Sequence, residues 1–97
     1  MIEVRYQPAF VRWLDGLTDE QARARIIVRI RRVSLGNPGD IKSLGGGLHE
    51  MRIDHGPGYR VYLCYRGPAI VVLLGGGDKG SQERDILRAR AALAAME

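Results

Sequence analysis

The pattern of apolar and polar positions predicts a strand followed by two helices in the first third of the chain. Residues 2–6 alternate apolar and polar side chains, which is the period of a strand. Apolar residues then recur at helical spacing, over residues 8–17 for a short helix and over residues 18–35 for a longer one. The longer helix opens on a capping-box sequence with Thr18 at the N-cap, and Gly36 is a natural C-cap.

The remainder of the chain predicts three strands and a last helix. Residues 37–47 contain a proline and four glycines but match neither common phosphate-binding fingerprint, so we expect a flexible connector rather than a phosphate loop. Strands over residues 48–54, 59–66 and 69–74 follow, and the short turns between them predict antiparallel pairing. Ser81 can cap the final helix.

The sequence therefore predicts one α+β domain over residues 1–97. Its order is strand, helix, helix, three strands and helix, with an antiparallel four-stranded sheet packed against the helices. A length of 97 residues and a hydrophobic content of 45% are typical of a small globular domain. No apolar run reaches the ~18 residues of a membrane span, and no signal peptide is recognisable, so we expect a cytoplasmic protein with no membrane partner.

The charge is basic and unevenly distributed, which indicates either an anionic partner or, equally, only the codon usage of a GC-rich genome. The net charge is +4, and 13 of the 15 basic residues are arginines. Residues 21–36 hold five arginines and no acidic residue, whereas residues 81–97 are balanced. Arg25, Arg29 and Arg32 line one side of the second predicted helix. Such a stripe is either a solvated helix face or a contact for a nucleic-acid backbone.

Two strand arginines and a loop lysine are candidates for a phosphate site. Arg52 and Arg60 lie on neighbouring predicted strands, and a hairpin would bring their side chains together. Two guanidinium groups repel each other unless an anion lies between them, either a phosphate or a carboxylate such as Glu50 or Asp54. Lys79 lies between glycines just before the final helix, whose N-terminus favours anions. Together the three cations would suit the transition state of phosphodiester cleavage.

Several other polar side chains allow a functional and a structural interpretation. Glu50 is either a general base for a ribose 2′-hydroxyl or the ion-pair partner of an arginine. Tyr62 is either a base-stacking side chain or, as we favour, a core aromatic residue. Cys64 lies mid-strand and is interpreted as a small buried side chain rather than a nucleophile. His49 and His55 lack the spacing of metal ligands, so we expect no metal and no small-molecule cofactor.

The ordered set of segments resembles the RelE/ParE toxin superfamily, and most closely its HigB-like addiction module killer proteins. The resemblance covers essentially the whole chain and rests on four segments: Leu48-His-Glu-Met-Arg-Ile53, Tyr59-Arg-Val-Tyr62, the apolar residues 69–74, and Lys79 with Gln82. It implies a small toxin that a cognate antitoxin, usually a helix-turn-helix DNA-binding protein, holds inactive. Many such toxins stop growth and translation as ribosome-dependent mRNA endonucleases, with basic residues in the site and the RNA 2′-hydroxyl as nucleophile.

The resemblance also implies roles for the basic residues. Arg52, Arg60 and Lys79 fall where superfamily members carry catalytic or phosphate-binding residues. The loop before the last helix departs from the common pattern, because it has one lysine and no aromatic residue. ParE-type members inhibit DNA gyrase by binding, so a gyrase inhibitor is an alternative function. A non-catalytic nucleic-acid-binding module is another, since it requires only the charge.

Overall fold

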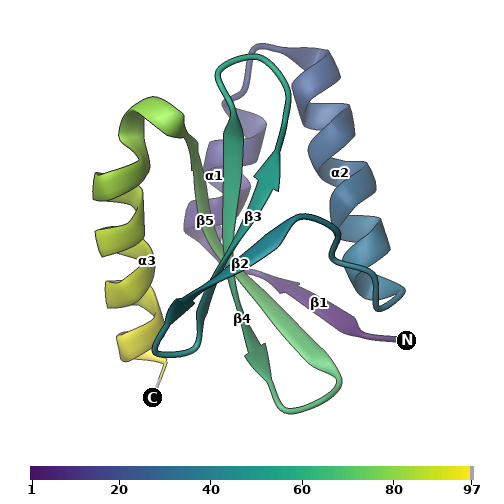
Figure 1. Ribbon diagram of the computed structural model, residues 1–97, viewed down its shortest axis with the longest axis vertical. Helices are drawn as coiled ribbons and strands as arrows, with labels where there is room; N and C mark the ends of the chain where they lie inside the picture. Colours follow the sequence, from purple (N-terminus) through teal and green to yellow (C-terminus); the bar gives the residue numbers. More distant parts are fainter. Residues whose placement is uncertain (97) are drawn as a thin grey trace.

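The computed structural model describes residues 1–96 and contains a five-stranded sheet with helices on both faces (Figure 1). The chain begins with β1 (Glu3–Tyr6), α1 (Pro8–Asp15) and α2 (Glu20–Ser34). Four strands follow: β2 (Ile41–Gly45), β3 (Leu48–Ile53), β4 (Tyr59–Arg66) and β5 (Ile70–Asp78). A 3₁₀ turn, η1 (Lys79–Ser81), leads into α3 (Gln82–Ala95). No helix in this part of the chain is long and apolar enough to cross a membrane.

The α+β class is confirmed, but the sheet is mixed and has five strands instead of the predicted four antiparallel ones. The strand order is β1-β5-β4-β3-β2, with β1 parallel to β5 and the other pairs antiparallel. Glu3 lies opposite Ile70, and Tyr6 lies opposite Leu73. The chain passes through both helices and the meander before β5 returns beside β1 in the same direction, so this pairing is parallel.

Two strand boundaries differ from the prediction. β2 lies in the segment that we expected to be a flexible connector, and it is an edge strand in which only Ile41 and Leu44 are partly buried. Its ladder with β3 is irregular between Ser43 and Gly45, and so short a strand shows no clear alternation in sequence. β5 is longer than predicted, because its glycines continue the ladder with β4 as far as Asp78.

Each face of the sheet carries its own apolar core. Helices α1 and α2 cover one face, where Phe10 and Ile26 pack in a cluster with Val61. Helix α3 covers the other face, where Leu93 belongs to a cluster that includes Cys64, a buried side chain as interpreted. Because successive residues of a strand point to opposite faces, alternate residues of β3 and β4 belong to different cores.

Helix α2 begins one residue later than the capping pattern indicated. Its N-cap is Asp19 and not Thr18, because the Asp19 carboxylate accepts hydrogen bonds from the backbone N–H groups of Gln21 at 3.0 Å and Ala22 at 3.1 Å. The same carboxylate lies 3.1 Å from Nε2 of His55, which links the β3–β4 turn to α2. The bond from Ala22 and the contact with His55 lower the pKa of Asp19 below its usual value.

Two glycines near the end of β5 allow the helices to approach the sheet closely. A Cβ atom at Gly76 would lie 2.3 Å from Cε3 of Trp13 in α1. A Cβ atom at Gly77 would lie 1.8 Å from Oδ2 of Asp85 in α3. Both distances are far shorter than van der Waals contact, whereas the position of a Cβ at Gly75 is open space. The two helices therefore lie against bare strand backbone here, next to the turn that carries the candidate lysine.

We expect Gly76→Ala to lower the free energy of unfolding by about 1–3 kcal/mol, because the added methyl group overlaps the indole ring of Trp13. Gly75→Ala is the matched control in the same strand and should change this free energy by less than about 0.5 kcal/mol. Urea unfolding followed by tryptophan fluorescence measures both. Equal unfolding midpoints for the two variants would show that the Trp13 ring moves aside with no loss of stability.

Candidate functional site

Arg52 and Arg60 are direct neighbours across the β3–β4 ladder. Their Cα atoms are register partners, so the two side chains lie on the same face of the sheet. They share this face with Tyr62, which belongs to the core beneath α3. Like charges in this position destabilise an antiparallel pair unless anions compensate them. The two arginines therefore require anions beside them, which the protein can supply as carboxylates.

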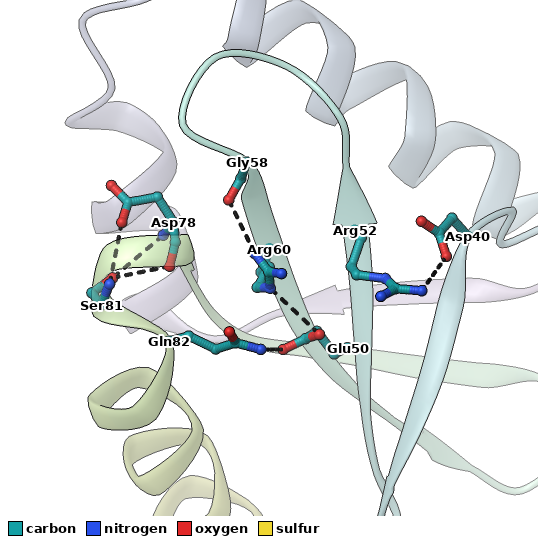
Figure 2. A network of polar contacts seen from close by, with 8 residues as sticks. All are labelled: Asp40, Glu50, Arg52, Gly58, Arg60, Asp78, Ser81 and Gln82. Carbon is teal, nitrogen blue, oxygen red and sulfur yellow. Dashed lines mark hydrogen bonds and ion pairs between the residues drawn. The ribbon is translucent and has the colours of Figure 1, made fainter.

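Each arginine has a carboxylate partner of its own (Figure 2). Arg52 Nη2 lies 3.0 Å from Asp40 Oδ1 in an exposed ion pair, a kind that contributes little to stability. Arg60 Nε lies 3.5 Å from Glu50 Oε1, and Glu50 is only 2% exposed. Of the two carboxylates considered from the sequence, Glu50 is thus a counter-ion, whereas Asp54 forms no ion pair within residues 1–96.

The geometry of Glu50 is that of a buried structural anion. Its Oε2 accepts a hydrogen bond of 2.9 Å from Nε2 of Gln82, and its Oε1 faces Arg60 (Figure 2). With both oxygens engaged below the surface, this carboxylate is out of reach of a ribose hydroxyl above the site. The ion-pair interpretation of Glu50 therefore replaces its interpretation as a general base.

Lys79 begins the turn η1 directly after β5. The Asp78 carboxylate fixes this turn by accepting hydrogen bonds from the N–H groups of Gly80 at 2.8 Å and Ser81 at 3.2 Å. The Ser81 hydroxyl in return accepts a bond of 3.3 Å from the Asp78 N–H (Figure 2). The Lys79 side chain is exposed and has no hydrogen bond or ion pair with any described residue. Its ammonium group is therefore available to an anion.

The three cations line one shallow cavity of about 340 Å³. Its charged wall consists of Asp40, Arg52, Asp54, Arg60 and Lys79, so positive charge is in excess. Gly58 lies beside two of these cations. A Cβ atom built at Gly58 would lie 3.7 Å from Nη1 of Arg60 and 3.8 Å from Cβ of Lys79. The fold thus brings the two strand arginines and the turn lysine, distant in sequence, to a single open surface.

Tyr62 is a core residue and has no exposed ring face on which an RNA base could stack. It is fully buried in the cluster beneath α3, opposite Glu50 in the ladder. Burial, followed by the negative charges of Glu50 and Asp85, raises the pKa of its hydroxyl well above the usual value. Tyr62 is therefore a core aromatic residue, as the sequence favoured, and not a base-stacking side chain.

The three candidate arginines of α2 divide into two groups. Arg25 and Arg32 are exposed beside a second cavity of about 320 Å³. Arg29 instead donates hydrogen bonds from Nη1 to the carbonyl oxygen of Arg52 at 2.7 Å and from Nη2 to that of Pro38 at 2.9 Å. A longer bond of 3.3 Å reaches the loop before β2, and burial lowers the pKa of Arg29. Arg29 anchors α2 to the sheet, which corrects its assignment to a nucleic-acid contact.

Sequence reasoning missed two contacts that shape the site. Asp40 pairs with Arg52, and Gln82 donates to Glu50 from 32 positions away in sequence. Asp40 precedes a strand that the pattern does not reveal, so nothing local indicated its position. Gln82 belongs to the segments that carry the family resemblance, but no local signal indicated its contact.

Comparison with known proteins assigns the sequence to a family. Residues 12–96 match the family model described as "Phage derived protein Gp49-like (DUF891)". The chain belongs to the Gp49-like family. The matched segment includes Arg52, Arg60 and Lys79. A relative from Haemophilus influenzae, described as an uncharacterized protein, is 46% identical over 89 residues, which cover 92% of this chain and 90% of the relative.

The Gp49-like family is associated with toxin–antitoxin systems. The expected link to toxin–antitoxin systems is thus confirmed for the family, whereas the RelE/ParE and HigB-like assignment stays a prediction.

We expect Arg29→Ala to lower the free energy of unfolding by about 1–3 kcal/mol, because the carbonyl groups that it binds lose a charged donor. Arg32→Ala is the control on the exposed side of the same helix and should change this free energy by less than about 0.5 kcal/mol. Urea unfolding followed by circular dichroism measures both variants. If Arg29→Ala were as stable as the control, its three backbone bonds would contribute nothing to the fold.

Proposed function

We propose that this Gp49-like protein is the toxin of a type II toxin–antitoxin pair and that it cleaves mRNA on the ribosome. The observation that carries the proposal is the open cavity that Arg52, Arg60 and Lys79 line together, with Lys79 unpaired within residues 1–96. Family membership supports the toxin part. The HigB-like resemblance supports the ribonuclease part and a helix-turn-helix antitoxin as partner. The activity belongs in the cytoplasm, where ribosomes translate mRNA.

The charge arrangement suits a phosphodiester group. The ion pair of Arg52 with Asp40 is exposed, so a phosphate can displace the carboxylate at little cost. Arg60 is held through its Nε by buried Glu50 and donates from Nη1 to the carbonyl oxygen of Gly58 at 3.3 Å, so its Nη2 remains for a ligand. Planar guanidinium groups form strong, directional hydrogen bonds to phosphate oxygens. A phosphate between the two arginines would also remove the repulsion between them.

The proposed reaction uses the 2′-hydroxyl of the RNA as nucleophile. This oxygen attacks the adjacent phosphorus, the bond to the 5′ oxygen of the next nucleotide breaks, and a 2′,3′-cyclic phosphate forms. Arg52 and Arg60 stabilise the extra negative charge of the pentavalent transition state. Lys79 stabilises the same charge or donates a proton to the departing 5′ oxygen.

Asp54 is the carboxylate that we assign to accept the proton of the 2′-hydroxyl. Glu50 is buried, and Asp40 is already paired with Arg52. Asp54 lines the cavity, is exposed, and has no ion pair within residues 1–96. An unpaired carboxylate beside the phosphate site can take a proton without first breaking another contact.

The basic face of α2 extends this site. The second cavity shares Ile53 and Asp54 with the first, so the two surfaces adjoin. Arg25 and Arg32 line the second cavity and are free to contact the backbone of mRNA or ribosomal RNA, or an acidic segment of the antitoxin. Such contacts would orient the RNA strand across the arginines and lysine.

Expression of the chain without an antitoxin should stop growth and produce cleaved transcripts. Lys79→Ala should slow cleavage by about 10²–10³-fold, because it removes a charge that stabilises the transition state. The side chain is exposed and unpaired within the described residues, so we expect this variant to fold like the parent. Arg12→Ala, at an exposed position on α1 outside the cavity, is the control and should cleave like the parent. Mapping of transcript 5′ ends gives the cleavage rate.

Arg60→Lys tests the second cation, because alanine at this position would leave Glu50 buried without a counter-ion. Growth arrest with intact transcripts and broken DNA would contradict the nuclease and support the gyrase inhibitor. RNA binding without cleavage by the parent protein would support the non-catalytic nucleic-acid-binding module.

Asp54→Asn should reduce the single-turnover cleavage rate by about 10²–10⁴-fold, since a general base is lost. Binding of an RNA with a 2′-deoxy group at the scissile position should stay close to that of the parent. The control is Asp15→Asn, at an exposed residue that ends α1. An Asp54→Asn protein that cleaves at the parental rate would remove Asp54 from the mechanism.

A further inference from the structure

Gln82, the first residue of α3, contacts the candidate site from beneath. Its Nε2 donates a hydrogen bond of 2.9 Å to Oε2 of Glu50. The other oxygen, Oε1, lies 3.5 Å from Nε of Arg60 (Figure 2). Helix α3 is therefore connected through one buried carboxylate to an arginine of the cavity.

The two carboxylate oxygens of Glu50 contact different elements, Oε1 the arginine of β4 and Oε2 the amide of α3. A carboxylate that is 2% exposed needs donors in place of the water it has lost. Arg60 Nε is buried and forms no hydrogen bond, so its distance of 3.5 Å is an ion pair without direct bonding. Gln82 satisfies one oxygen of Glu50, and the guanidinium group of Arg60 lies between the other oxygen and the carbonyl oxygen of Gly58, to which Nη1 donates at 3.3 Å.

We infer that Gln82 is a positioning residue that keeps the Arg60 guanidinium at the cavity by fixing the Glu50 carboxylate. Without the amide, Glu50 would keep the Arg60 guanidinium and the neighbouring Tyr62 hydroxyl, and of these only Arg60 carries a positive charge. The guanidinium group would then move toward the carboxylate and away from a phosphate in the cavity. This inference rests on the proposed function, because it concerns the placement of a cation for RNA phosphate.

Gln82→Glu tests the inference with almost no change of shape. The carboxyl group that this substitution introduces can still donate to Glu50 when it is protonated, whereas its ionised form repels Glu50. Cleavage by this variant should therefore fall as pH rises and recover as pH falls, a step absent from the pH profile of the parent. Gln82→Ala should lose activity by roughly 10–100-fold at every pH, the value of one hydrogen bond to a charged group.

Other charged groups near Glu50 could also contribute to the pH dependence of cleavage. The titratable and charged groups around it come from β3 and its two neighbouring strands: Arg52, Lys42, Arg60 and Tyr62. From α3, Asp85 acts on Tyr62. All of them are common to the parent and the variant. Gln21→Glu is the matched control, because it makes the same charge change in the first turn of α2 at an exposed side chain. It should leave the parental pH profile unchanged.

The position of Arg60 can be measured without any RNA. Its Nε–H resonance in a ¹H–¹⁵N spectrum is identified by its absence from Arg60→Lys, and Gln82→Ala should shift it, whereas Gln21→Glu should not. Parental pH profiles together with an unmoved Arg60 resonance in the Gln82 variants would overturn the inference. If the parent protein cleaves no RNA, the proposed function fails, and the resonance alone decides whether Gln82 positions Arg60.

Discussion

The burial of Glu50 is the constraint on which the rest of the site depends. A carboxylate removed from water must be held by donors, and these come from Arg60 on β4 and Gln82 on α3. The Glu50 carboxylate therefore contacts the neighbouring strand through Arg60 and helix α3 through Gln82, and it orients the Arg60 side chain. Arg52 has an exposed counter-ion instead. The paired guanidinium groups differ accordingly: one is fixed from below, and the other is free to exchange its partner.

Features that depend on neighbouring residues were predictable from the sequence. The alternation of residues 2–6 and the helical spacing that follows indicate their elements without reference to the rest of the chain. The pairing of Arg52 with Arg60 also follows from local information, because a short turn between two strands fixes which residues face each other. The proximity of Lys79 was a weaker expectation, since it required β5 to return beside β4.

Features that depend on distant segments were not predictable. β2 is stabilised by its ladder with β3, and its own residues carry little strand signal. An arginine on a helix has the same sequence pattern whether it is solvated or, like Arg29, bonded to backbone carbonyl groups of another element. Likewise Glu50 has the pattern of a surface acid until α3 covers it with Gln82.

The parallel pairing of β1 with β5 has a consequence for the order of folding. Glu3 pairs with Ile70, so the contact encloses most of the chain, and the entropy lost on closing a loop grows with its length. The β3–β4 hairpin, which holds both arginines, is local and should form early. During synthesis the sheet would remain open at its β1 edge until β5 has left the ribosome. The β3–β4 hairpin with both arginines would thus form while β1 is still unpaired.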